Sequence, residues 1–263
     1  MYNFEYQKAG SVADAAKAAT GEAKILAGGM TLLPTLKLRL AQPSKLVDLG
    51  GIKDLVGIKA EGGGLTIGAM TTHAAVAASA DVKKAIPALA DLAEGIGDPA
   101  VRNRGTIGGS VANNDPAADY PAACVALGAT IVTSKRKIAA GDFFKGLFET
   151  ALEEGEIVTA ISFPAPEKAA YQKFRNPASR YALVGVFVAK TKGGARVAVT
   201  GAGEGGVFRK KSFEAALDKN FAAAALDGIK VESKNLNSDI HASADYRAHI
   251  ITVMAKRAVA AAK

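Results

Sequence analysis

Residues 106–119 read TIGGSVANNDPAAD, and residues 27–34, AGGMTLLP, repeat part of the same pattern. In each stretch a glycine pair stands between an apolar, strand-like run and an apparent helix. Glycine lets a ligand approach the main chain closely, and a turn into a helix leaves amide N–H groups free near the positive end of the helix dipole. Either turn alone could be a tight β-to-α connection. Together they predict that two loops hold the diphosphate of a dinucleotide between them.

Short polar side chains follow the second glycine pair, and several of them could bind phosphate oxygens or ribose hydroxyls. Asp115 stands before a proline and is expected to cap the helix that follows. Asp119 lies about one turn further along, where capping no longer explains a carboxylate. We therefore expect Asp119 to accept a hydrogen bond from a ribose hydroxyl. The other polar candidates in this loop are Thr106, Ser110, Asn113 and Asn114.

The sequence around the two loops predicts an α+β fold in three parts. Residues 1–55 alternate helix-like and strand-like segments, which is typical of a small α/β unit. Residues 56–166 add a hairpin turning at Gly63 and Gly64, a helical stretch and further strands, and they end at a PAP linker. Residues 167–263 contain two strands around a TKGG turn and end with a long helix.

The composition is that of a globular protein, because 49% of the 263 residues are hydrophobic and 22% are charged. No apolar stretch reaches the ~18–20 residues that a membrane span needs. The opening MYNFEYQKAGS lacks the apolar core of a secretory signal, so we expect a cytoplasmic protein. The 33 Lys and Arg residues exceed the 25 Asp and Glu residues, but they are scattered, so nucleic-acid binding is not expected. The single cysteine, Cys124, is expected to be a packing residue.

Other motifs predict no chemistry of their own. GAGEGG at residues 201–206 matches the dinucleotide pattern G-x-G-x-x-G, with Asp218 in the place of the ribose acid. The strand before it pairs through the tight TKGG hairpin and is therefore antiparallel, whereas a Rossmann unit needs parallel strands. His73, His241 and His249 have no metal-ligand set or catalytic triad around them. The chain is therefore expected to lack acid–base machinery of its own.

These motifs resemble a known family. AGGMTLLP, VRNRGTIGGSVANNDPAAD and LEEGEIVTAISFP are similar, in this order, to the FAD-binding medium subunit of molybdenum hydroxylases, the group of xanthine dehydrogenase and carbon monoxide dehydrogenase. YALVGVFVA and SADYRAHIITVMAKRA resemble the C-terminal domain of that subunit. The resemblance implies a two-subdomain FAD-binding domain of the vanillyl-alcohol-oxidase type, residues 1–55 and 56–166. A small α+β C-terminal domain, residues 167–263, would follow.

The resemblance also implies which residues bind the cofactor. Ile157 would pack near the flavin, Lys173 would contact the cofactor, and Tyr181 aligns with an aromatic residue that covers the isoalloxazine in some relatives. From the residues alone, Tyr181 could simply pack in its strand, and Lys173 would face solvent. The first diphosphate loop would consist of Ala27, Gly28, Gly29, Met30 and Thr31, and the second of Thr106, Gly109, Ser110, Asn113 and Asp119.

The function implied by the resemblance is electron transfer in a heteromeric enzyme. A large subunit with a molybdenum cofactor would oxidise the substrate, which is an aldehyde, carbon monoxide, a purine or another N-heterocycle. A small subunit would pass the electrons through [2Fe–2S] clusters to FAD in this chain, and from there to NAD, oxygen or a quinone. The assembly would be a dimer of heterotrimers. The single cysteine agrees with this division, because iron–sulfur clusters need several cysteine ligands.

Two alternatives remain open. A self-sufficient flavin oxidoreductase of the same fold would act directly on a small molecule, but it would need a base that the sequence does not offer. A non-catalytic scaffold subunit would have kept the fold and lost the flavin. The intact glycines in both loops argue against the scaffold, because they have little use without a cofactor.

Overall fold

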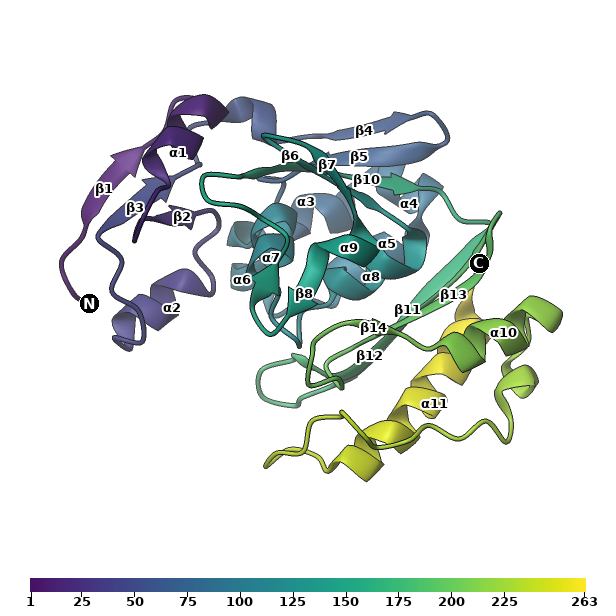
Figure 1. The fold of residues 1–263 in the computed structure, drawn as a ribbon. Coiled ribbons are helices and arrows are strands. Elements are labelled where there is room, and N and C mark those ends of the chain that lie inside the picture. The colour runs from purple at the N-terminus through teal and green to yellow at the C-terminus, as the bar shows by residue number, and fades with distance from the viewer.

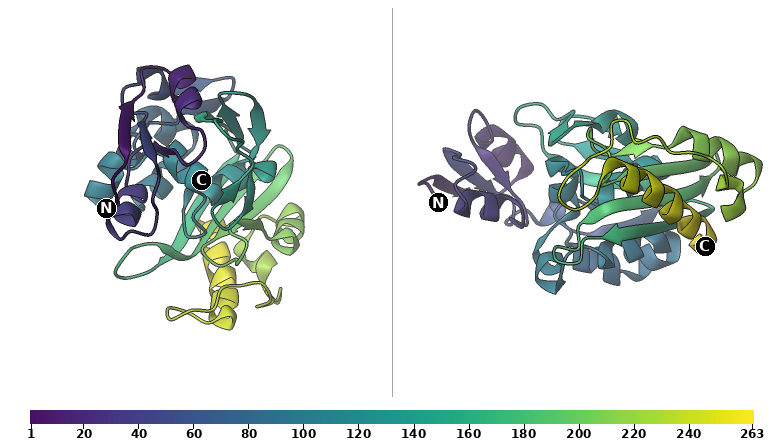
Figure 2. Two further views of the ribbon diagram at one scale, coloured as in Figure 1. Left: turned by 60° about the vertical axis from the view of Figure 1, so that its left-hand side comes forward. Right: turned by 90° about the horizontal axis from the view of Figure 1, so that it is seen from below.

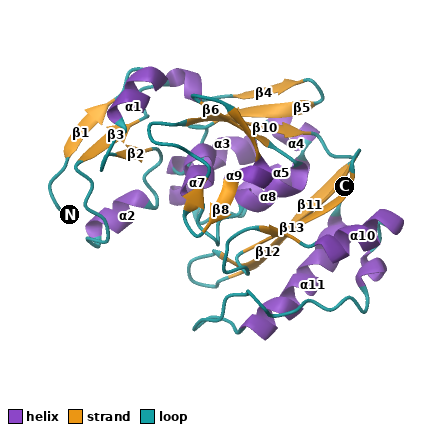
Figure 3. Ribbon diagram, in the orientation of Figure 1, coloured by secondary structure: helices purple, strands orange, loops and turns teal.

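The computed structural model describes residues 1–263, and its strands form three main sheets with helices packed between and beside them (Figures 1 and 3). The N-terminal residues form a lobe that stands beside the rest of the molecule (Figure 2). The remaining chain forms layers in the order central sheet, helices, C-terminal sheet, helices (Figure 1). This mixture of elements confirms the predicted α+β class. No helix combines the length and apolar character that a bilayer span would need.

The N-terminal lobe is a three-stranded parallel sheet with the order β1-β3-β2. The predicted alternation of helix and strand is confirmed, but the sequence missed the first strand because its side chains are mostly exposed and polar. A small core of its own holds the lobe together, with Val47 and Ala15 fully buried in it. The elements are β1 (Glu5–Lys8), α1 (Val12–Ala18), β2 (Lys24–Leu26), α2 (Leu32–Lys37), β3 (Lys45–Asp48) and the 3-10 helix η1 (Lys53–Leu55).

The central sheet is antiparallel, with the order β4-β5-β10-β6-β7. Its hairpin turns at Gly62 and Gly63, one residue earlier than predicted, because these two glycines have positive φ. The strands are β4 (Ile58–Glu61), β5 (Gly64–Gly68), β6 (Thr130–Thr133), β7 (Lys137–Ala139) and β10 (Val158–Pro164), and a two-stranded hairpin, β8 (Phe144–Gly146) with β9 (Glu149–Thr150), follows the short helix α9 (Ala140–Phe143).

The helical stretch before the second glycine loop is three helices rather than one. Ser79 caps the second, since its hydroxyl accepts from the amide of Val82, and Pro87 opens the third. The third ends at Gly95. The helices of this part are α3 (His73–Ala78), α4 (Ala80–Ala85), α5 (Pro87–Glu94), α6 (Pro99–Arg104), α7 (Ile107–Asn113) and α8 (Tyr120–Leu127).

Three details predicted for the second glycine loop are wrong. No strand precedes it, since helix α6 ends at Arg104, and its glycine pair lies in the first turn of α7 rather than in a turn before it. Asp115 does not cap a helix either: α8 begins only at Tyr120, and the Asp115 carboxylate accepts from the amide of Ala117 in a tight turn. The segment between α7 and α8 is therefore an irregular loop.

The C-terminal sheet is antiparallel, with the order β11-β12-β13-β14. Its pairing confirms that GAGEGG does not belong to a Rossmann unit, and Asp218 instead accepts from the amide of Ala195. One face packs on helices α5 and α8 and the other on α10 and α11 (Figure 1). The elements are β11 (Lys168–Arg175), β12 (Ala182–Thr191), β13 (Gly194–Thr200), β14 (Phe208–Arg209), α10 (Lys211–Lys219), the 3-10 helix η2 (Ala223–Leu226) and α11 (Ala244–Ala261).

The largest hydrophobic core crosses from the central sheet to the C-terminal sheet. Ile161 of β10, Leu89 of α5 and Phe187 of β12 belong to one continuous cluster and are fully buried. Tyr171 of β11 stacks near Phe187 in the same cluster. Helices α5 and α8 are thus fixed from both sides, and the loops at their ends are positioned by the C-terminal sheet as well as by the central one.

Candidate cofactor-binding site

A cavity of about 980 Å³ lies between the N-terminal lobe and the rest of the chain. Its volume is at the upper end of the range for cofactor sites, about 300–1,000 Å³. Both glycine loops line it, as does the loop between β11 and β12. Of the thirteen residues predicted to bind the cofactor, twelve line this cavity: Ala27, Gly28, Gly29, Met30, Thr31, Thr106, Gly109, Ser110, Asn113, Asp119, Ile157 and Tyr181.

The two glycine loops touch each other through their backbones. A Cβ atom added to Gly28 would lie 2.1 Å from the carbonyl oxygen of Arg104 and 2.8 Å from the Cα of Gly105. Gly29 has φ 74°, a conformation that other residues rarely adopt. Ala27 also lies close to Gly109, whose added Cβ would be 3.2 Å from the Ala27 Cβ. The glycines therefore allow two loops 75 or more residues apart in the chain to meet.

The first loop has free amide donors. The backbone N–H groups of residues 27–32 have no acceptor within the chain, although all six residues line the cavity. Thr31, at the start of α2, makes no side-chain capping bond to replace them. A run of unpaired amides at a helix start is the arrangement that binds phosphate. This loop has the features expected of an anion site.

The second loop differs from the prediction, because the amides of its glycine pair are already paired. The amide of Ile107 donates to Thr71 O, that of Gly108 donates to Ala69 O, and that of Gly109 donates to the hydroxyl of Thr106. What this loop offers to the cavity is side chains: the hydroxyl of Ser110 and the amide of Asn113 line it without a partner in the chain. The loop can therefore bind a ligand through side chains rather than through backbone donors.

Asn114 does not serve the cavity directly. It adopts a left-handed conformation, with φ 45°, and is almost fully buried. Its side-chain amide donates to the carbonyls of Gly146 and Glu149, both at 2.8 Å. Asn114 therefore fastens the β8–β9 hairpin, whose exposed tip residue Phe148 also lines the cavity.

Asp119 is held by two side chains of strand β11. Its carboxylate accepts from the hydroxyl of Tyr171 and pairs with the ammonium of Lys173 at 3.0 Å. Burial raises the pKa of Asp119, against the lowering effects of Lys173 and Tyr171. The strand pattern alone placed Lys173 in solvent, but its side chain is buried. Lys173 does not line the cavity, and its ammonium also donates to Gly95 O at 2.8 Å.

Tyr181 and Ile157 present apolar surface to the cavity from opposite parts of the chain. Tyr181 is 48% exposed, lies in the loop before β12, and lines the cavity rather than packing in a core. Burial, with contributions from Asp115 and Asp119, raises the pKa of its hydroxyl, which stays protonated at neutral pH. Ile157 stands just before β10 and is nearly buried. Both can pack against an aromatic ring system.

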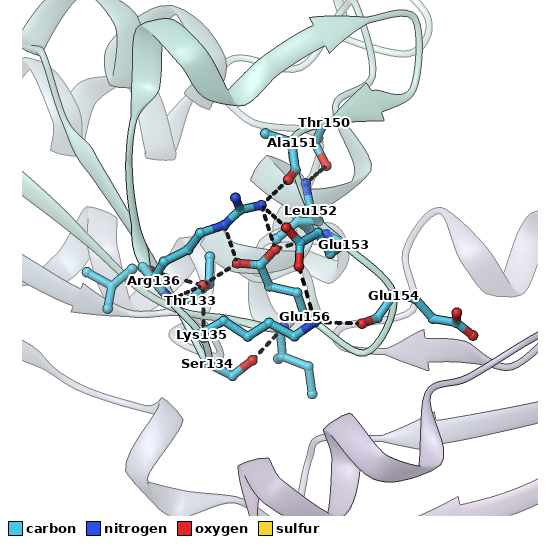
Figure 4. Close-up of polar contacts among 12 residues, drawn as sticks. Thr133, Ser134, Lys135, Arg136, Thr150, Ala151, Leu152, Glu153, Glu154 and Glu156 are labelled. Carbon is cyan, nitrogen blue, oxygen red and sulfur yellow. Dashed lines mark hydrogen bonds and ion pairs between the residues drawn. The ribbon is translucent and has the colours of Figure 1, made fainter.

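A buried carboxylate that the sequence did not single out fixes the segment around Ile157 (Figure 4). The side chain of Glu156 is fully buried and accepts from Arg136 Nε at 3.1 Å, Thr133 Oγ1 at 2.6 Å and the amide of Glu153 at 2.9 Å. Burial raises the pKa of Glu156, but these hydrogen bonds outweigh it and lower the pKa to about 2. Glu156 is therefore ionised across the physiological range.

The same segment joins the N-terminal lobe to the central part. The carboxylate of Glu154 accepts from the amide of Gly21, at 2.6 Å, and a Cβ on Gly155 would lie 2.9 Å from Ala16 O. Residues 153–157 all line the cavity. The segment thus closes one edge of the cavity and restrains the distance between its walls. In the sequence, the acidic run LEEGE and the basic run KRK carry opposite charges, and this was the available signal that the two segments pair.

His73 is a further lining residue that the sequence did not assign. Thr72 caps helix α3, and the imidazole of His73 is buried against Gly105, whose added Cβ would lie 2.6 Å from Nε2. Its Nδ1 has no hydrogen-bond partner. Burial, together with the charge of Arg102, lowers the pKa of His73 to about 4, so the ring is neutral at physiological pH.

Comparison with known proteins identifies the family. Residues 2–166 match the family described as "FAD binding domain in molybdopterin dehydrogenase". The chain belongs to this family. It is 37% identical to the carbon monoxide dehydrogenase medium chain of Afipia carboxidovorans, across 99% of this chain and 97% of that one. It is 35% identical to the glyceraldehyde dehydrogenase medium chain of Sulfolobus acidocaldarius, across 97% and 96% of the two chains.

A solved structure extends the likeness to the fold. A chain of reconstituted CO dehydrogenase from Oligotropha carboxidovorans superposes with a TM-score of 0.92 at 35% identity, covering 98% of this chain and 97% of that one. The resemblance drawn from the glycine motifs is thus confirmed. This protein is an FAD-binding medium subunit of the molybdenum hydroxylase type, an oxidoreductase subunit.

The volume and the lining residues of the cavity fit FAD. It is large enough for a dinucleotide, it carries six unpaired amides for the diphosphate on one side and unpaired polar side chains on the other, and it offers apolar surface for the ring system.

Gly28→Ala should separate the two loops. Because the new methyl group would overlap the Arg104 carbonyl, we expect FAD affinity to fall at least about tenfold and the free energy of unfolding to fall by roughly 1–3 kcal/mol. Gly141→Ala is the matched control, since a Cβ there meets open space. Flavin fluorescence titration measures the affinity. Wild-type affinity in Gly28→Ala would contradict the contact between the loops.

His73 should make the folded chain less stable in acid. Its folded pKa, about 4, lies below the ordinary histidine pKa of 6.5, so the unfolded chain binds more protons between these values and stability falls as pH drops from 6.5 to 4. The loss attributable to His73 is on the order of 3 kcal/mol. His73→Gln should remove this part of the pH dependence, and His249→Gln, at an exposed position, should not. An unchanged pH dependence in His73→Gln would refute the assignment.

Proposed function

We propose that this chain carries FAD as the electron-transfer subunit of a heteromeric molybdenum hydroxylase. The observation that carries the proposal is the row of six unpaired amides at residues 27–32, which line the same cavity as the unpaired side chains of Ser110 and Asn113. A doubly negative diphosphate between two subdomains would satisfy these donors together. Bound FAD would accept two electrons and release them singly or as a pair.

The chain's own residues bind and orient the cofactor in this proposal. The first loop, Ala27 to Thr31, and the second loop, with Thr106, Gly109, Ser110 and Asn113, would hold the diphosphate. Asp119 would accept from a hydroxyl of the cofactor, with Lys173 acting by holding its carboxylate. Ile157 and Tyr181 would pack against the flavin ring. No residue is assigned as an acid or base, which agrees with a subunit that transfers electrons only.

Partner subunits are part of the proposal. The relatives are named as medium chains of dehydrogenases, which supports a large subunit with the molybdenum cofactor and a small subunit with [2Fe–2S] clusters. We propose a dimer of such heterotrimers in the cytoplasm, with electrons leaving FAD for NAD, oxygen or a quinone. Substrate would be oxidised in the large subunit. The division of this chain at residues 55 and 166 is also proposed, and the three separate sheets support it.

The test uses the complex purified through this chain. We expect one FAD per chain, molybdenum and iron in the co-purified subunits, and substrate-dependent reduction of an acceptor. In a complex carrying Gly28→Ala, acceptor reduction should fall with the flavin content, while substrate-dependent bleaching of the iron–sulfur absorbance should persist. In this proposal FAD only passes electrons from the clusters to the acceptor, so its loss should reduce acceptor reduction and leave reduction of the clusters by substrate unchanged.

Two outcomes would contradict the proposal. A complex that contains no FAD and still reduces the acceptor would leave the chain as a scaffold. An isolated chain that binds FAD and oxidises an organic donor without partners would instead be a self-sufficient flavin oxidoreductase. Gly141→Ala serves as the control for both measurements, because the substitution lies in open space.

A further inference from the structure

The end of strand β13 holds the cavity wall from outside the cavity. The hydroxyl of Thr200 lies 2.6 Å from the carbonyl oxygen of Ala118 and 3.0 Å from that of Pro116. A hydroxyl has one proton, so it donates mainly to the nearer oxygen, while the amide of Gly201 donates to Pro116 O at 2.7 Å. Thr200 is fully buried and does not line the cavity.

Gly201, the first glycine of GAGEGG, allows the end of strand β13 to approach the loop between α7 and α8 closely. It has φ 80°, and a Cβ there would lie 2.3 Å from Ala182 O. Its carbonyl accepts from Arg247 of α11 at 3.1 Å and from the side chain of Asn237 at 3.3 Å. The motif that imitates a dinucleotide fingerprint is therefore a rigid corner of the C-terminal sheet, placed under the loop between α7 and α8.

The loop that this corner holds is a wall of the cofactor cavity. Asp115, Ala118 and Asp119 line the cavity within four residues of the bonds to Thr200. The same sheet holds the Asp119 carboxylate through strand β11. The loop between its strands β11 and β12 also reaches the segment that follows α5, where the guanidinium of Arg180 donates to Gly97 O at 3.2 Å. Three connections thus run from the C-terminal sheet to the cavity.

All of these connections start outside residues 2–166, the part that matches the FAD-binding family. The matched part supplies the lining loops, but the backbone of its second wall is fixed by hydrogen bonds from residues 171–201. Removing the Thr200 hydroxyl would leave the carbonyl of the half-buried Ala118 without its donor on the side away from the cavity. The loop would then shift to find another partner, and Asp119 would shift with it.

We propose that Thr200 is a positioning residue of the cofactor site, acting through the 116–119 loop rather than by touching FAD. This inference rests on the proposed function, because it concerns the same cavity. It assigns the C-terminal sheet a part in cofactor binding that goes beyond packing. The hydroxyl, and not merely the volume of the side chain, is what the role requires.

The test compares three variants in the full chain. Thr200→Val keeps the shape and loses the hydroxyl, Thr200→Ser keeps the hydroxyl, and Thr191→Val is the matched control. Thr191 lies at the other end of the same sheet, where its hydroxyl donates to Gly194 O at 2.8 Å. FAD dissociation constants and the flavin absorption spectrum are measured at a temperature where circular dichroism shows every variant folded.

We expect Thr200→Val to weaken FAD binding about tenfold, as the loss of a donor to a half-buried carbonyl implies, and to shift the flavin spectrum. Thr200→Ser and Thr191→Val should bind FAD like the wild type. In a chain that already carries Asp119→Asn, Thr200→Val should lower FAD affinity by much less than a further tenfold, because both changes act through one loop.

Three results would overturn the inference. Unchanged FAD binding in Thr200→Val would show that the hydroxyl does not position the loop. An equal loss in Thr191→Val would show a general effect of sheet stability. If Thr200→Val does not fold, Thr200→Ala is measured instead, and failure of both to fold would assign Thr200 to stability alone. A wild-type chain that binds no FAD would refute the proposed function itself, a separate and distinguishable result.

Discussion

The contact between two stretches of backbone sets the geometry of this protein. Gly28 lies against the carbonyl of Arg104 so closely that even a methyl group would overlap it. This contact joins the N-terminal lobe, which has its own small core, to the part of the chain that shares the large core. The cavity lies between this contact and a second connection, in which the segment of Glu154 and Glu156 joins the lobe to the central part.

The two loops at this contact divide the work of binding. The first keeps its amides free, since no capping side chain or carbonyl reaches residues 27–32. In the second loop the amides of Ile107 and Gly108 donate to carbonyls of the central part, Thr71 O and Ala69 O, and these hydrogen bonds fix the position of the loop. One wall thus supplies donors and the other supplies rigidity. A loop that is already fixed loses less conformational entropy when the cofactor binds.

Much of the site could be predicted from the sequence, because glycine pairs and the DPxxD run are local signals. The second loop was misread as a strand–turn–helix because the sequence cannot show that RNR ends a helix or that Gly108 faces Ala69 across a distant contact. From the residues alone Lys173 was expected in solvent, since its strand pattern does not show that the end of helix α5 and Asp119 cover it. His73 and Thr200 were missed because their partners are more than 30 residues away and carry no pattern, and Glu156 because only the opposite charges of LEEGE and KRK indicate that the two runs meet.

Amide hydrogen exchange, resolved to single residues with and without FAD, tests the central claim most directly. The account predicts that FAD slows exchange at residues 28–32, whose amides have no partner in the chain, and changes little at residues 107–109, whose amides are already paired. Unchanged exchange at residues 28–32 in a chain saturated with FAD would contradict it, because the diphosphate would then be held somewhere other than the first glycine loop.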